Sequence, residues 1–243
     1  MKTTKLIQLL LSLLLAAVLL CTGVFLVSAA AGKPVPAVTA ESQPQFQDVQ
    51  ESDYYYNAVL WAVDYGITQG TSETTFSPAQ PCTRAQIVTF LWRAFREPEP
   101  ETTQNRFMDV KAGKYYEKPV RWAAEQNITA GTTPTTFSPG RDCTRAQTLT
   151  FLWRACGSPA VSNGENPFQD VKAGSYYYRA VLWAIQTGIT TGSSADMFYP
   201  NQTCTRAEAV TFLYRARDLL GLPETADVPE ETDPNQGTWV PVP

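Results

Sequence analysis

One pattern of residues recurs three times along this chain, at an interval of 61 residues and without insertion or deletion. Each copy begins with F-x-D-V and continues with W-A, a glycine, F-x-P and finally T-R-A-Q or T-R-A-E. The first phenylalanines of the copies are Phe46, Phe107 and Phe168. Because so many positions match in one register, the sequence predicts three copies of a single structural unit.

Each copy is predicted to form two helices joined by a loop. In the first copy, apolar residues fall at i, i+3, i+4 and i+7, the spacing of one helix face. They are Ala58, Trp61, Ala62 and Tyr65. Glycine or asparagine, which accept a left-handed cap, follow this helix as Gly66, Asn127 and Gly188. A second apolar face belongs to Ile87, Phe90, Leu91 and Ala94.

The expected fold class is all-α, with three tandem two-helix repeats. We expect the repeats to span residues 45–96, 106–157 and 167–221. The connections between them are rich in Pro, Glu, Ser, Thr, Asn and Gly, as linkers are. Residues 222–243 are acidic and rich in proline, which predicts a disordered tail.

Residues 1–30 have the pattern of a secretory signal peptide. Lys2 and Lys5 precede an apolar run over residues 6–27, and small residues follow at 28–31. We expect cleavage near Ala30 or Ala31 and therefore an exported protein. An uncleaved membrane anchor is the alternative, because about 20 apolar residues suffice to span a bilayer.

The charge balance and the missing histidines exclude several classes of function. The chain has 23 acidic and 19 basic residues and no basic run, which argues against nucleic acid as a partner. It has no histidine, the commonest general base and metal ligand. One aspartate per copy suits a loop hydrogen bond better than the asymmetric carboxylate pair of a glycosidase. We expect no enzyme, no metal and no cofactor; the aspartates are Asp48, Asp109 and Asp170.

Three cysteines occupy equivalent positions just before the second helix of each copy: Cys82, Cys143 and Cys204. No C-x-x-C spacing accompanies them, so we interpret them as small buried hydrophobic residues rather than as metal ligands. Cys156 lies at the far end of the helix after Cys143, about 20 Å away and beyond disulfide reach. All four are expected to be free thiols.

The motif T-R-A-Q/E predicts a capping box at the start of the second helix. In such a box the threonine oxygen accepts from the backbone N–H three residues on, and that residue's side chain accepts from the threonine N–H. The predicted pairs are Thr83 with Gln86, Thr144 with Gln147, and Thr205 with Glu208.

Capping does not explain the arginine inside this motif. Arg84, Arg145 and Arg206 occupy the first helical position, where the helix dipole disfavours a cation. One interpretation is that each arginine shares an anion with the helix N-terminus. The other is that it lies over a neighbouring repeat or pairs with a carboxylate such as Asp48. The charge pattern alone does not choose between them.

Together, these motifs resemble the S-layer homology domain of bacterial surface proteins, over almost all of residues 45–218. The resemblance implies a pseudo-threefold helical assembly around a central bundle. It also implies grooves between repeats that bind secondary cell-wall polysaccharide, often carrying a pyruvate ketal. The arginine of T-R-A-E/Q contacts that acidic group in the family, which assigns the anion here to Arg84, Arg145 and Arg206. Departures are the cysteines, where a branched aliphatic residue is usual, and Gln86 and Gln147, where glutamate is more usual.

Two further sets of residues are secondary candidates for the binding site. The tryptophans lie on an apolar helix face, which indicates core packing first and a sugar contact second. The glycines indicate a tight turn first and a close approach of ligand to backbone second. These candidates are Trp61, Trp122, Trp183, Gly70, Gly131 and Gly192.

We therefore expect a secreted module, without a catalytic domain, that anchors to the bacterial cell wall through acidic polysaccharide. No membrane contact is expected in the mature form unless the N-terminal segment is retained. Several weak contacts with one polymer would add up through avidity. The alternative is a surface protein-interaction or scaffold module whose sites hold the carboxylates of a partner.

Overall fold

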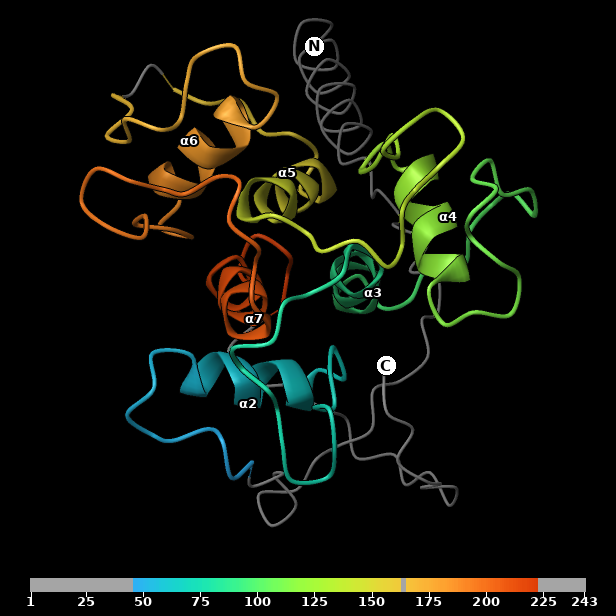
Figure 1. The fold of residues 1–243 in the computed structure, drawn as a ribbon, viewed down its shortest axis with the longest axis horizontal. Coiled ribbons are helices and arrows are strands. Elements are labelled where there is room, and N and C mark those ends of the chain that lie inside the picture. Colours follow the sequence, from blue (N-terminus) through green and yellow to red (C-terminus); the bar gives the residue numbers. More distant parts are fainter. Residues whose placement is uncertain (1–45, 163–164, 223–243) are drawn as a thin grey trace, which may run out of the picture. The chain divides into compact units, whose positions relative to one another are not determined.

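The computed structural model describes residues 46–162 and 165–222. The regular secondary structure of this part consists of six α-helices, two in each copy of the repeat (Figure 1). They are α2 (Tyr56–Asp64), α3 (Arg84–Ala94), α4 (Glu117–Glu125), α5 (Arg145–Ala155), α6 (Tyr178–Gln186) and α7 (Arg206–Arg215). The predicted all-α fold class is confirmed. All six helices belong to one compact unit, which lies within Lys33–Pro243.

The first helix of each copy ends where the sequence predicts. Gly66, Asn127 and Gly188 follow α2, α4 and α6, with φ angles of 65°, 57° and 73°. These values lie in the left-handed region, which glycine and asparagine tolerate best. The side chains at these positions therefore mark a real helix boundary.

The second helix of each copy begins at a capping box. At α3, the Thr83 Oγ1 accepts from the Gln86 N–H at 3.2 Å, and the Gln86 Oε1 accepts from the Thr83 N–H at 2.9 Å. The N-termini of α5 and α7 repeat both hydrogen bonds, with Gln147 and Glu208 in the place of Gln86. The three predicted caps are confirmed.

These second helices are buried more completely than the sequence predicts. Every residue of α3 except Arg93 is buried, on all sides of the helix rather than on one apolar face. The reason is that α3, α5 and α7 pack together in the interior. Residues of all three helices line a small void there, among them Leu91, Leu152 and Leu213.

Helix packing crosses from each repeat to the next. α4 packs against α3, α6 against α5, and α2 against α7 (Figure 1). Just beyond α3, the rings of Phe95 and Trp122 lie 5.5 Å apart, and between α7 and α2 the rings of Tyr214 and Trp61 lie 5.7 Å apart. α7 of the third repeat packs against α2 of the first repeat, so the contacts between repeats close into a cycle.

A ring of three backbone hydrogen bonds joins the starts of α3, α5 and α7, which we call the inner helices. The Cys82 N–H donates to the Cys204 carbonyl at 2.9 Å, the Cys143 N–H to the Cys82 carbonyl at 2.8 Å, and the Cys204 N–H to the Cys143 carbonyl at 2.8 Å. All three side chains are fully buried, and they carry free thiols, as does Cys156. The cysteines serve as small core residues on the pseudo-threefold axis of the repeats.

The aspartate of F-x-D-V holds the loop that precedes the second helix. The two carboxylate oxygens of Asp109 accept from the N–H groups of Phe137 and Ser138, at 2.8 and 2.7 Å. Ser138 has a φ of 59°, a conformation that a serine adopts only when its surroundings hold it there. Asp48 and Asp170 make the equivalent pairs of hydrogen bonds. The predicted loop hydrogen bond is confirmed.

At its C-terminal end the described structure reaches one residue into the segment predicted to be a tail. Leu222 is only 3 % exposed, and its N–H donates to the Arg217 carbonyl at 2.8 Å, so the tail prediction is wrong at this residue. The rest of the predicted tail and the predicted signal peptide lie outside the described residues. Among residues 46–162 and 165–222, none of the helices has the length and apolar character needed to cross a membrane.

Candidate functional site

Three arginines, one from each repeat, lie at the contacts between repeats. Arg84, Arg145 and Arg206 begin α3, α5 and α7, and each side chain extends to the loop of the next copy in the cycle. The three residues expose only 3 %, 3 % and 0 % of their surface. We call each of these arginines, together with its contacts in the next copy, an arginine junction.

In each junction a carbonyl oxygen and two aromatic rings hold the guanidinium group. The Arg84 Nε–H donates to the Phe137 carbonyl at 2.9 Å, and the guanidinium carbon lies 4.7 Å from the Phe137 ring centre and 5.2 Å from that of Phe151. A cation over an aromatic face is attracted by the ring quadrupole, so the rings replace part of the lost hydration. The equivalent partners are Phe198 and Phe212 for Arg145, and Phe76 and Phe90 for Arg206.

The backbone at the start of each inner helix is already hydrogen-bonded. The Arg84 N–H donates to the Arg141 carbonyl at 2.9 Å, and the Ala85 N–H donates to the Pro139 carbonyl at 3.1 Å. The third N–H belongs to the capping box, and α5 and α7 repeat the pattern. The interpretation that the helix N-terminus shares an anion with the arginine is therefore wrong, because carbonyls of the next repeat occupy those donors. The first backbone N–H groups of these helices are therefore not available to an anion.

The other interpretation of the arginines is confirmed in one respect and wrong in another. Each arginine does lie over a neighbouring repeat, as the contact of Arg206 with Phe76 illustrates. Asp48, however, does not pair with an arginine, because its two oxygens accept from the N–H groups of Phe76 and Ser77. The F-x-D-V aspartates therefore form no ion pair with these arginines among the described residues.

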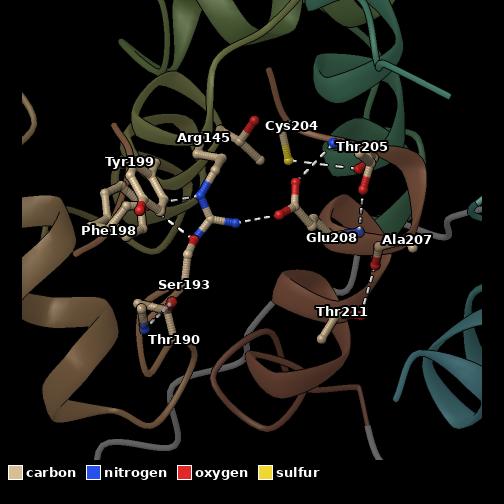
Figure 2. A network of polar contacts seen from close by, with 12 residues as sticks. Arg145, Thr190, Ser193, Phe198, Tyr199, Cys204, Thr205, Ala207, Glu208 and Thr211 are labelled. Atoms are coloured by element: carbon tan, nitrogen blue, oxygen red, sulfur yellow. Dashed lines mark hydrogen bonds and ion pairs between the residues drawn. The ribbon is translucent and has the colours of Figure 1, made fainter. Parts of the chain in front are cut away.

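The Arg145 junction contains such a charge within the protein. Arg145 Nη1 donates to Glu208 Oε1 at 2.5 Å, and Glu208 Oε2 accepts from the Thr205 N–H at 2.9 Å (Figure 2). The arginine side chain is 4 % exposed and the glutamate side chain 20 %. Glu208 therefore caps α7 and neutralises Arg145 at the same time.

The other two junctions lack an internal carboxylate. Within the described ranges, neither Arg84 nor Arg206 has an acidic group at ion-pair distance. Arg206 Nη2 donates to Thr68 Oγ1 at 3.1 Å, whereas its buried Nη1 has no hydrogen-bond partner in the described part of the chain. Burial lowers the pKa of both guanidinium groups, because a desolvated charge is less stable. Arginine nevertheless keeps its proton in proteins, so both side chains are buried cations.

Of the secondary candidates, the tryptophans and Gly70 are buried, whereas Gly131 and Gly192 are partly exposed. The tryptophans of the W-A motif are core residues that expose 3 %, 5 % and 3 % of their surface: Trp61, Trp122 and Trp183. The loop glycines have left-handed φ angles of 86°, 86° and 90°: Gly70, Gly131 and Gly192. A Cβ at Gly70 would lie 2.6 Å from the Phe46 ring, so a close approach within the protein requires this glycine. A contact of these residues with sugar stays a prediction.

Sequence reasoning did not find the aromatic partners of the arginines. Phe90, Phe151 and Phe212 recur at the same 61-residue interval, so the repeat contains the signal. Their helical spacing indicates only core packing, and it does not say which repeat supplies the guanidinium group that they contact.

The chain matches the profile of the S-layer homology domain over residues 45–88, 106–149 and 167–210. These segments make up more than half of the sequence, and the described part of each contributes an arginine junction and a capping box. The chain belongs to the S-layer homology domain family.

Relatives share this region and differ in the rest of their length. The chain is 35 % identical over 114 residues to an endoglucanase of Bacillus sp. (strain KSM-635), which covers 47 % of this chain and 12 % of the relative. It is 33 % identical over 120 residues to the surface-layer 125 kDa protein of Lysinibacillus sphaericus, covering 48 % and 10 %. It is 23 % identical over 189 residues to an S-layer protein of Bacillus thuringiensis subsp. finitimus, covering 77 % and 23 %. Each alignment spans less than a quarter of the relative.

Proposed function

We propose that this chain is an exported, non-catalytic module that anchors to the bacterial cell wall. In this proposal it binds secondary wall polysaccharide through its arginine junctions, and the group contacted is a carboxylate such as that of a pyruvate ketal. Membership of the S-layer homology domain family supports the anchoring role, as do relatives whose names describe surface-layer and cell-surface proteins.

The observation that carries the proposal is a buried guanidinium group without an ion-pair partner among the described residues, at Arg84 and again at Arg206. A buried charge costs several kcal/mol because it loses its hydration. Aromatic rings and a single carbonyl recover part of this cost. A carboxylate from outside would recover more, because the planar guanidinium presents paired N–H donors that match its two oxygens.

The small exposed fraction of the arginines limits the form of the ligand. With 3 % of its surface exposed, Arg84 presents only an edge of its side chain to solvent. Such an edge suits a single carboxylate that projects from a polymer better than a broad anionic surface. Each such contact would be weak alone, and a polymer that engages two junctions of one chain would gain avidity.

The acidic residues of the repeat support a non-catalytic role. Asp48, Asp109 and Asp170 each use both carboxylate oxygens to accept backbone N–H groups of their loops. A general acid or base has to exchange a proton with substrate, and these carboxylates are committed to holding a turn. Hydrolysis of wall glycan is therefore not part of the proposal.

The proposal is tested by pelleting the compact unit Lys33–Pro243 with purified cell-wall sacculi, before and after chemical extraction of the secondary polymer. Arg84→Met is the informative variant, because it removes the charge and keeps an unbranched apolar stem between Phe137 and Phe151. Lys118→Met is the matched control, because it removes one positive charge from an exposed side chain. Thermal unfolding of both variants reports whether the fold persists.

We expect binding that requires the polymer, that weakens about tenfold in Arg84→Met and that is unchanged in Lys118→Met. Binding that survives extraction of the polymer would instead favour a protein-interaction module whose junctions hold a partner's carboxylates. Equal pelleting of a folded Arg84→Met variant and the parent would show that this arginine is structural only.

A further inference from the structure

The three arginine junctions differ in charge at the last residue of T-R-A-Q/E. In the Arg145 junction this residue is Glu208, which comes from the next repeat in the cycle and contacts the guanidinium group directly. The equivalent residue is Gln147 in the Arg84 junction and Gln86 in the Arg206 junction. The pseudo-threefold repeat therefore places a carboxylate beside one arginine and a neutral amide beside each of the other two.

The capping box decides which atom of this residue faces the arginine. Each box needs an acceptor for the threonine N–H, and Glu208 supplies Oε2 for this purpose while Oε1 accepts from Arg145. Gln147 and Gln86 supply their Oε1 to the same kind of N–H, at 3.3 and 2.9 Å. Because the amide is planar, its NH2 group then takes the position that the second carboxylate oxygen of Glu208 occupies. At Arg84 and Arg206 the amide and the guanidinium group are both hydrogen-bond donors.

We propose that the three junctions are not equivalent and that Glu208 acts as a built-in anion that closes the Arg145 junction. The Arg84 and Arg206 junctions receive the external carboxylate, which accepts from the guanidinium group. At Arg84 it also accepts from the amide NH2 of Gln147. This inference rests on the proposed function and names the sites at which it operates.

The unpartnered Nη1 of Arg206 supports this assignment independently. It is a buried donor without an acceptor among the described residues, in a side chain that is 0 % exposed. A buried donor that is left unpaired destabilises the protein, so an acceptor that reaches it is favoured. At the Arg145 junction Glu208 already supplies the equivalent acceptor.

The Arg84 and Arg206 junctions differ in how much of their side chains is exposed to solvent. Gln147 is partly exposed and Arg84 is 3 % exposed, whereas Gln86 is 6 % exposed and Arg206 is 0 % exposed. Neighbouring side chains must move before an anion reaches Arg206, and much smaller movements suffice at Arg84. The Arg84 junction is therefore the first to fill.

Exchanges of glutamine and glutamate test the inference without truncating an arginine. Gln147→Glu installs an internal carboxylate at Arg84, and Glu208→Gln removes the one at Arg145. Both variants keep an oxygen for the capping box, as the parent residues at the equivalent positions do. Glu73→Gln, on an exposed loop residue, changes the net charge as Glu208→Gln does and serves as its control.

The side-chain Nε–H signals of the arginines in 15N–1H NMR spectra report each junction separately. Each of these groups donates to a carbonyl in the interior, so we expect its exchange with water to be slow. The probe is a methyl hexoside that carries a pyruvate ketal, and the methyl ester of the same compound is the neutral control. The signals are assigned with Arg→Lys variants at each position, and the compact unit Lys33–Pro243 is titrated.

In the parent, we expect the Arg84 signal to move first, the Arg206 signal to move at higher probe concentration, and the Arg145 signal to stay in place. Gln147→Glu should abolish the Arg84 shift and weaken binding to wall polymer about tenfold. Glu208→Gln should add an Arg145 shift, and Glu73→Gln should behave as the parent does.

The possible failures are distinguishable. An Arg145 shift in the parent at the same probe concentration as the Arg84 shift would overturn the role of Glu208 and leave anion binding intact. Pelleting with polymer-bearing sacculi without any arginine shift would overturn the assignment of the anion to the junctions, and this inference with it. A chain that neither pellets nor shows a shift would overturn the proposed function itself.

Discussion

Replacing Asp109 by asparagine should destabilise the whole fold and loosen one arginine junction. The two oxygens of Asp109 accept from Phe137 and Ser138 at 2.8 and 2.7 Å, and they hold Ser138 at a φ of 59°. Asparagine keeps one oxygen and places an NH2 group where the second oxygen was. A donor then faces a donor, so one of the two hydrogen bonds is lost and its N–H is left without an acceptor.

The size of the effect follows from the charge on the acceptor. A hydrogen bond to a charged group contributes about 1.5–3 kcal/mol, and a strained turn offers no compensating conformation. We therefore expect Asp109→Asn to lower the free energy of unfolding by about 2–3 kcal/mol. For a chain of this length that corresponds to a fall in Tm of about 5–10 °C.

Thermal unfolding followed by circular dichroism at 222 nm measures the change, with Asp142→Asn as the control. Asp142 is an exposed residue near the same loop. Because the Phe137 carbonyl accepts from the Arg84 Nε–H, the NMR signal of that group should also broaden or lose protection in Asp109→Asn. A variant that unfolds within about 0.5 kcal/mol of the control would refute the assigned role of the aspartate.

Three other predictions concern the loop, the cap and the cysteines. Gly70→Ala should destabilise the fold by more than Asp109→Asn, because the new Cβ lies 2.6 Å from the Phe46 ring at a φ of 86°. Urea unfolding measures the change, and a fall in the free energy of unfolding of less than about 1 kcal/mol would contradict the prediction. Thr83→Ala should cost about 1 kcal/mol in the same assay, with Thr83→Ser close to the parent. At pH 8 and under native conditions, iodoacetamide should modify Cys156 before Cys82, because Cys82 is fully buried; mass spectrometry of tryptic peptides identifies the site, and faster labelling of Cys82 would be the contrary result. Burial raises the pKa of the Cys82 thiol from 9.0 to about 12. The free energy of unfolding should therefore be unaffected by this group below pH 9 and should fall as the pH rises from 9 toward 12, because the unfolded chain loses the thiol proton first. Urea unfolding at pH 8 and pH 10 measures the fall, and a Cys82→Val variant should lack the part due to this thiol.

Local signals in the sequence account for much of the fold. The capping boxes at Thr83 and its equivalents depend on residues three positions apart, and the helix ends at Gly66 and Asn127 depend on single residues that tolerate a left-handed φ. Such interactions are decided within one turn of chain, so the residue pattern is sufficient to predict them. The repeat interval then extends each of these assignments to the other copies.

Local signals in the sequence predict only part of the candidate site. The position of Arg84 at the start of a helix follows from T-R-A-Q, and so does the expectation that this cation needs an explanation. Its partners do not follow, because Phe137 lies 53 residues further along the chain. The carbonyls of Pro139 and Arg141, which occupy the helix N-terminus and leave no donor there for an anion, have no sequence signal at all.

The sequence by itself determined that there are three units, where their helices begin and end, and which residue carries the unexplained charge. Only the tertiary structure decided which unit packs on which. Three nearly identical copies present nearly identical apolar faces, so a first helix has the same pattern whether it packs on its own second helix or on that of its neighbour. Packing across the repeats brings each arginine beside the capping residue of the next copy. Glu208 therefore neutralises Arg145, whereas Arg84 and Arg206 are buried without an ion-pair partner in the part of the chain that the structure describes.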